Sequence, residues 1–273
     1  INYTNKDSLR RYHVFSVFED SRGVIWFGTI GAGIYKYDPQ LEKEGQLAFT
    51  NITTKEGLVN DNIGCIYEDK KGRIWFGTMG GASCYDSVKN TFRNFTVRNG
   101  LSNNDINAII EDDEGRFWFG TRGAACCYEE TDNMQDVTAF TRLEKEDGSE
   151  FVNVRSIIID ESGEIWLGGN DGLWSFRNGT FLNYSNSFVG YIYEDSNENI
   201  WTGSVSQNSR NWELSRYDKV ALPISVRSAT HIKDQEGQLF GITEAKNGDI
   251  WYGHERGVCK FKSGDLSSGL TSL

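Results

Sequence analysis

A short motif recurs through the whole chain and constrains its fold more than any other feature. Its clearest copy is GRIWFGTMGGASCYD, residues 72–86. Each copy follows an apolar run that ends in acid, and the copies lie 35 to 50 residues apart along the 273-residue chain. The tryptophans that mark them are Trp26, Trp75, Trp118, Trp166, Trp201 and Trp251. A period of about 45 residues is that of one β-propeller blade, so the sequence predicts a repeat protein with no second domain.

Each unit predicts four short strands: an apolar inner strand, the IWFGT strand, a third strand and an outer strand such as FRNFT. Four strands of about five residues with turn signals between them are the composition of one blade. The turn has the form EDxxG, in which Asp can bond its own backbone and Gly supplies a positive φ. We therefore expect a structural role for Asp20, Asp69, Asp112, Asp160 and Asp195. The repeated tryptophans are expected to fill the wedges between neighbouring blades.

The predicted fold is all-β, a six-bladed propeller that occupies residues 1–273 as a single domain. The blades are expected at about 14–53, 63–97, 106–143, 154–184, 189–233 and 240–262. The last unit lacks a good fourth strand, whereas residues 1–4 look like an outer strand without its inner three. Pairing residues 1–4 beside the third strand of the last unit closes the ring and removes its open edges. Blade five departs from the pattern through an insertion at residues 204–211.

The sequence of the repeat resembles that of the two-component regulator propeller repeat, whose typical unit is GLPSN, an apolar strand and EDxxGxLWIGTxxGG. The fit is closest in GLVNDNIGCIYEDKKGRIWFGTMGGASCYD and GLSNNDINAIIEDDEGRFWFGTRGAACCYE, and the resemblance covers essentially the whole chain. It implies a periplasmic or otherwise extracytoplasmic sensor propeller of a bacterial regulator, of a kind often attached to histidine kinases and linked to carbohydrate sensing. This sensing function is inferred only by analogy with proteins that share the fold.

Composition excludes some partners. A net charge of −11 and a pI near 4.9 argue against nucleic acid, because a phosphate-binding face needs a basic excess. No run approaches 18 apolar residues, so we expect no membrane span in this segment.

The chain begins at Ile1 without Met or a signal segment and is expected to be part of something longer. Its five cysteines lack metal-ligand spacing and are expected to be buried thiols, and no cofactor or metal is expected.

Two loop families are expected to share one rim of the propeller, one before each inner strand and one after each IWFGT strand. Side-chain chemistry varies at these positions while the framework repeats, which is typical of a scaffold with a specialised binding face. The candidate ligand-binding residues are His13, Asn62, Asp105, Asn107, Arg122, Asn153, Arg155, Asn170, Gln207, Arg210 and His254.

Each candidate has an alternative. Arg122 and Arg155, in adjacent blades, could converge on an anion, or each could pair with a local carboxylate. The asparagines suit sugar hydroxyls, but Asn is also favoured in loops. His13, Asp105 and His254 could form a metal or acid/base set, although no HxH, HExxH or paired-carboxylate spacing supports one. The sequence has no nucleophile elbow or phosphate-binding loop either.

The sequence thus favours a sensing propeller that recognises a carbohydrate or a similar small polar ligand at the channel mouth. A homodimer and attached signalling domains are the further partners we expect. Two alternatives stay open: a propeller enzyme, such as a lyase or hydrolase acting on polysaccharide, and a structural module for protein contacts. We leave catalysis undecided and favour binding.

Overall fold

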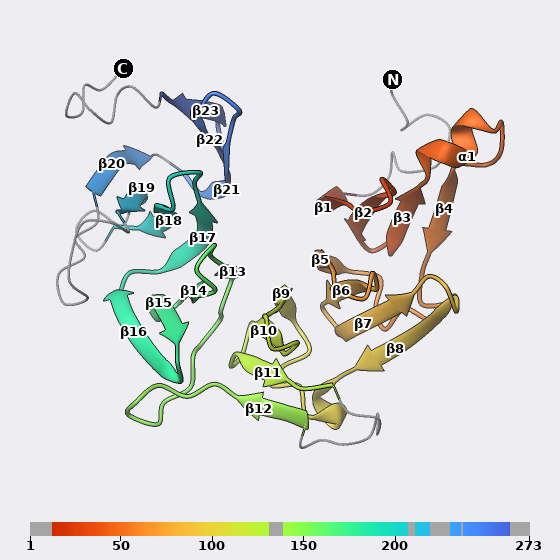
Figure 1. Ribbon diagram of the computed structural model, residues 1–273, viewed down its shortest axis with the longest axis horizontal. Helices are drawn as coiled ribbons and strands as arrows, with labels where there is room; N and C mark the ends of the chain where they lie inside the picture. Colours follow the sequence, from red (N-terminus) through yellow and green to blue (C-terminus); the bar gives the residue numbers. More distant parts are fainter. Residues whose placement is uncertain (1–12, 131–138, 207–210, 219–229, 236, 263–273) are drawn as a thin grey trace. The chain divides into compact units, whose positions relative to one another are not determined.

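The computed structural model describes residues 13–130, 139–206, 211–218, 230–235 and 237–262. Within those ranges it contains six antiparallel sheets, five of four strands and one of three. Each sheet is one propeller blade, so the predicted all-β, six-bladed fold is confirmed (Figure 1). The chain divides into two compact units, residues 1–143 and residues 144–273. The predicted closing strand, residues 1–4, lies outside the described residues, and the single-domain assignment stays a prediction.

The first unit holds three blades, each built as a meander in which consecutive strands pair (Figure 1). Blade one consists of β1 (His13–Glu19), β2 (Ile25–Ile30), β3 (Ile34–Tyr37) and β4 (Phe49–Ile52), with the short helix α1 (Pro39–Lys43) before β4. Blade two consists of β5 (Ile63–Glu68), β6 (Ile74–Thr78), β7 (Gly81–Asp86) and β8 (Thr91–Phe95). Blade three consists of β9 (Ile106–Glu111), β10 (Phe117–Thr121), β11 (Cys126–Tyr128) and β12 (Phe140–Arg142).

The second unit holds the other three blades in the same order of strands. Blade four consists of β13 (Ser156–Ile159), β14 (Ile165–Gly169), β15 (Gly172–Arg177) and β16 (Thr180–Ser185). Blade five consists of β17 (Val189–Glu194), β18 (Ile200–Val205), β19 (Trp212–Tyr217) and β20 (Thr230–Gln235). Blade six has β21 (Leu239–Glu244), β22 (Ile250–His254) and β23 (Gly257–Phe261) within the described residues.

The second strands of blades two to five are covered on both faces, which explains their almost continuous apolar sequence. All five residues of β6 are buried, and so are all five of β10. Close approach of the next blade also explains the glycine of IWFGT. A Cβ on Gly77 would lie 2.4 Å from the Cys65 sulfur and 2.8 Å from a methyl carbon of Ile106 in blade three. The small residue therefore sets the distance between blades two and three.

The repeated tryptophan is tied to the repeated aspartate in blades one to five. Each indole Nε1 donates to the Asp of its own EDxxG turn, at 3.1, 2.8, 2.8, 2.9 and 2.7 Å from Trp26 to Trp201. The other carboxylate oxygen of Asp69 accepts the backbone N–H groups of Lys71 and Arg73. One buried carboxylate thus closes the turn and holds the wedge tryptophan, so the structural role predicted for these aspartates is confirmed.

Glutamates at the end of the inner strand join neighbouring blades at several places, which the sequence did not reveal. Glu68 of blade two accepts the backbone N–H and the hydroxyl of Ser21 in blade one, both at 2.7 Å. Glu244 of blade six accepts the same two groups of Ser196 in blade five, at 2.7 and 2.8 Å. Glu111 accepts the N–H of Lys70 in the same way. The ED pair therefore has two tasks, one within its blade and one toward the preceding blade.

Blade six differs from the others in its turn, and the wedge role expected for its tryptophan stays a prediction. Ala245 stands where the other blades have Asp, and Trp251 is 39% exposed, with the Lys260 ammonium 5.5 Å from its ring. The other five tryptophans are essentially fully buried. Trp75, for example, packs against Phe117 of blade three with ring centroids 4.5 Å apart.

The five cysteines are all free, as expected from their positions in the repeats. Cys84 and Cys126 are buried, and the other three are partly buried. Burial raises the pKa of Cys65, Cys84 and Cys127 to about 12, so these three stay protonated at neutral pH. No helix among the described residues is long and apolar enough to cross a lipid bilayer.

Candidate functional site

The two loop families adjoin within each blade through backbone hydrogen bonds. The N–H of Met79 donates to the carbonyl of Asn62 at 3.1 Å, and that of Arg122 donates to Asp105 at 2.9 Å. In blade five the N–H of Val205 donates to Phe188 at 2.9 Å. The positions before the inner strand and after the second strand are therefore neighbours, which is the geometry on which the rim hypothesis depends.

Candidates in the first unit are held mainly by local partners. The Arg122 guanidinium forms an ion pair with Asp105 at 3.3 Å, although the Arg122 side chain stays 65% exposed. The side-chain amide of Asn62 donates to Asn60 at 3.2 Å. Asn107 lies half-buried in β9, and His13 lies exposed at the start of β1. For Arg122, the local ion pair raised as the alternative is what the structure contains.

Candidates in the second unit include one direct pair. The Asn153 amide donates to the Asn170 side-chain oxygen at 2.9 Å, which brings two predicted residues of blade four together. Arg155 precedes β13, and its side chain has no ion pair among the described residues. Burial raises the pKa of Tyr191, and the nearby charge of Arg155 acts in the opposite direction. His254 lies in blade six with its Nε2 3.3 Å from the Cys259 sulfur.

The other expected groups of ligand-binding residues stay predictions. Gln207 and Arg210 lie outside the described residues. Arg122 belongs to the first unit and Arg155 to the second, and the three residues of the suggested His13, Asp105 and His254 set are divided between the units in the same way. Within the described parts of the chain, no group of three or more His, Cys, Asp or Glu side chains is arranged to hold a metal ion.

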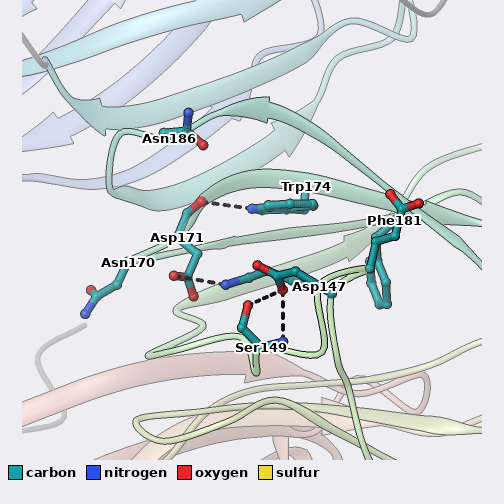
Figure 2. Close-up of a pocket in the computed structure, with 9 residues that line it drawn as sticks. Asp147, Ser149, Asn170, Asp171, Trp174, Phe181 and Asn186 are labelled. Atoms are coloured by element: carbon teal, nitrogen blue, oxygen red, sulfur yellow. Dashed lines mark hydrogen bonds and ion pairs between the residues drawn. The ribbon is translucent and has the colours of Figure 1, made fainter.

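A pocket of the second unit lies on blade four and includes one predicted residue, Asn170 (Figure 2). It is open to solvent and encloses about 500 Å³. Its aromatic walls are Trp174 and Phe181, and its uncharged polar groups belong to Ser149, Asn170 and Asn186. Its charged side chains are those of Lys145, Glu146, Asp147 and Asp171. The charged loop before blade four, residues 144–150, thus forms one wall.

Asp171 holds that loop against the blade. Its carboxylate accepts the backbone N–H of Val152 at 2.5 Å and pairs with the Lys145 ammonium at 3.2 Å. Its backbone carbonyl accepts the Trp174 indole N–H at 2.8 Å. Phe151 packs edge-on against Trp174, with ring centroids 5.4 Å apart. One aspartate in the hairpin between β14 and β15 therefore fixes both the loop wall and the orientation of the indole.

Trp174 differs from the small residues that three other blades have at the same position. In each blade a residue of the third strand pairs with the middle residue of the second strand; in blade one it is Tyr35, and in blades two, three and five it is Ser83, Cys126 and Ser215. The side chains of these three small residues are fully buried. In blade four the same position is Trp174, paired with Leu167 and only partly buried. A comparison of third strands across the units would have shown this signal in the sequence.

The polar wall of the pocket is ordered. The Asp147 carboxylate accepts the hydroxyl and the backbone N–H of Ser149, at 2.6 and 2.9 Å. These bonds lower the pKa of Asp147, so it is ionised at neutral pH. Lys145 is only 13% exposed, and its ammonium lies 5.3 Å from the Phe151 ring and 5.9 Å from the Trp174 ring. An aromatic surface beside carboxylate and amide groups suits binding of a small polar molecule.

The repeated blades define the class: the chain is a β-propeller protein whose units follow one sequence pattern. The family model described as "Two component regulator propeller" matches residues 8–31, 57–80 and 100–123. Three stretches of the chain, all in its first half, therefore carry the two-component regulator propeller repeat. No curated protein sequence matches the chain.

Solved structures share the fold. The extracellular domain of a candidate hybrid two component system, BT3049 from B. thetaiotaomicron, is 24% identical, with a TM-score of 0.55 over 94% of this chain and 40% of that one. The extracellular domain of a candidate one component system, BT4673 from B. thetaiotaomicron, is 21% identical, with a TM-score of 0.67 over 92% and 34%. PorZ of Porphyromonas gingivalis, a bacterial surface component of the type-IX secretion system, is 14% identical, with a TM-score of 0.63 over 95% and 40%. This chain thus spans about two fifths or less of the length of these three proteins.

Proposed function

We propose that this propeller is an extracytoplasmic, periplasmic sensing module of a bacterial two-component-type regulator, and that it binds a small saccharide at the rim of blade four. The observation that carries the proposal is the blade-four pocket, where rim residue Asn170 lies beside the aromatic wall of Trp174 and Phe181. The two-component regulator propeller repeat supports the sensing role. The extracellular location of the domains with the same fold supports the compartment.

The chemistry of the pocket matches that of a sugar ring. One face of a pyranose carries C–H groups that pack on an indole, while its hydroxyls need donors and acceptors at the edges. Trp174 supplies the indole, and Asn170, Asn186 and Asp147 supply the polar groups. A pocket of about 500 Å³ lies within the range of roughly 300 to 1,000 Å³ typical of small-molecule sites. Because the indole is fixed by its bond to Asp171, little order is lost when a ligand binds.

Signalling partners are part of the same proposal. The chain covers only 34 to 40% of the length of the three similar proteins described above. Attached domains are therefore expected to convert ligand binding into a signal. A homodimer formed through the parent protein is a further expectation. A lyase or hydrolase remains the alternative activity, and a turnover assay on polysaccharide with the purified chain would reveal it.

Calorimetric titration with a panel of monosaccharides and short oligosaccharides tests the proposal. We expect wild type to bind at least one of them and Trp174→Ala to lose that binding tenfold or more, since stacking on an indole supplies much of the contact. Trp251→Ala is the matched control, because Trp251 is exposed in blade six and does not line the pocket. Absence of binding to wild type, or equal binding by the Trp174→Ala protein, would leave the structural module as the better interpretation.

A further inference from the structure

The blade-four pocket carries more negative than positive charge, and this bears on which saccharide it accepts. Four of its lining side chains are ionisable: Lys145, Glu146, Asp147 and Asp171. The one cation is paired with Asp171 at 3.2 Å and is largely covered. Neither Glu146 nor Asp147 has an ion-pair partner within 4 Å among the described residues. A ligand in the pocket therefore meets two carboxylates that no cation neutralises directly.

Resting on the proposed function, we infer that the pocket selects a saccharide unit bearing a protonated amine over a neutral or acidic unit of the same size. The amine would lie against the Glu146 and Asp147 wall while the ring packs on Trp174. An acidic sugar, which the rim arginines had suggested, would be repelled here. The sign of the charge on the sugar thus decides which saccharide binds best. Packing on the aromatic wall contributes affinity for amine-bearing, neutral and acidic sugars alike.

The turn that carries Asp147 is rigid enough to present a fixed charge. Lys145 and Ser149 are joined by a backbone hydrogen bond of 2.8 Å, and the N–H of Gly148 donates to the Lys145 carbonyl at 2.9 Å. Gly148 has a φ of 78°, which only glycine adopts without strain. Both hydrogen bonds from Ser149 engage Oδ1 of Asp147, so Oδ2 can accept a bond from an ammonium group. In the view of Figure 2, Asp147 lies beside Trp174 on the side away from Asn186.

The aromatic rings already tolerate an ammonium group. The Lys145 ammonium lies within 6 Å of both the Phe151 and Trp174 rings, at the distances of cation–π contacts. A ligand ammonium over the exposed part of the indole face would meet two carboxylates, whereas the Lys145 ammonium that would repel it is already paired with Asp171. Because Glu146 and Asp147 are exposed and solvent screens them, the preference is expected to be modest, roughly threefold to tenfold.

The experiment compares glucosamine, glucose, N-acetylglucosamine and glucuronate at pH 6 by calorimetry or by NMR titration. We expect glucosamine to bind wild type threefold to tenfold more tightly than glucose, with N-acetylglucosamine near glucose and glucuronate weakest. Raising salt from about 0.05 to 0.5 M should shrink the difference, since the Debye length falls several-fold. The double variant Glu146→Gln, Asp147→Asn should abolish the preference for glucosamine, so that the ratio of glucosamine to glucose affinity within the variant falls to about one, while Asn preserves the turn bonds to Ser149.

Glu144→Gln is the control, since Glu144 lies in the same loop but does not line the pocket. Equal binding of glucosamine and glucose by wild type overturns the inference and leaves the proposed function standing. A preference that survives in the double variant also overturns it, because the amine is then recognised elsewhere. If none of the four sugars binds and the longer saccharides fail too, the proposed function is refuted together with the inference.

Discussion

Glu130 is the acceptor of an ion cluster that joins blades two and three. Its carboxylate oxygens accept bonds from Arg73 at 2.6 Å, Lys71 at 2.6 Å and Arg93 at 2.8 Å. Burial alone would raise its pKa, but the bonds from Arg73 and Lys71 outweigh it and hold the pKa at about 2. Replacing Glu130 by Gln removes this charge and leaves two partly buried guanidinium groups facing a neutral amide.

The magnitude follows from the pKa. Lowering it from 4.5 to about 2 corresponds to roughly 3 kcal/mol of preference for the charged form in the folded state. The Glu130 side chain is 21% exposed, so part of this is screened and we expect Glu130→Gln to cost about 2 kcal/mol at pH 7. Because the folded pKa is depressed, the contribution is fully present above about pH 4.5 and is lost as the pH falls from there through about 2.

Urea unfolding of wild type and Glu130→Gln at pH 7, 4.5 and 2.5 measures this contribution. Urea is preferred to guanidinium chloride because the latter is a salt and screens the cluster. Glu129→Gln is the control, since Glu129 is the exposed neighbour in sequence. The reasoning is refuted if Glu130→Gln unfolds within about 0.5 kcal/mol of wild type at pH 7, or if the difference between them is the same at pH 2.5.

Three further changes test the scaffold and the rim. Trp118→Ala should cost roughly 3 to 5 kcal/mol in urea unfolding, because the indole is buried and bonded to Asp112; a cost under about 1 kcal/mol would contradict its place between blades. Gly77→Ala should cost about 1 to 3 kcal/mol by the same assay, since its Cβ would lie 2.4 Å from the Cys65 sulfur, and a neutral result would mean that the blades can separate there. Arg155→Ala should leave both saccharide affinity in calorimetry and the melting temperature unchanged, because Arg155 does not line the blade-four pocket and has no ion pair among the described residues; a clear loss of affinity would place the ligand beside Arg155 instead.

The fold could be predicted from the sequence because one pattern is repeated six times. The period, the EDxxG turns and the apolar strands all specify a blade, and Asp69 closes its turn as its residue type and spacing indicate. Short helix α1 was missed, although Asp38 caps it and Pro39 occupies its first turn, which is a recognisable helix start. The link from Glu68 to Ser21 spans 47 residues, and nothing local in the sequence specifies such a contact.

The candidate site was harder to predict because it depends on what is not repeated. Alignment of the units drew attention to loop positions that face the rim, and two of these, Asn153 and Asn170, do meet. The same alignment treated third strands as framework, so the change from a small buried residue to Trp174 was passed over. The loop before blade four is charged, and its charges alone do not show that Lys145 turns inward to Asp171.

Trp174 and Trp251 are two of the three tryptophans outside the fully buried set, and they differ in how they relate to the repeat. Trp251 holds the repeated position in a blade that has Ala245 in place of the usual Asp. Trp174 stands in the third strand, at a position where blades two, three and five bury a small residue and blade one buries Tyr35. Asp171 fixes the orientation of the Trp174 indole, and the loop of residues 144–150 forms a wall beside it. An indole held by its own hydrogen bond at the edge of a pocket is the feature on which the proposed saccharide site in blade four depends.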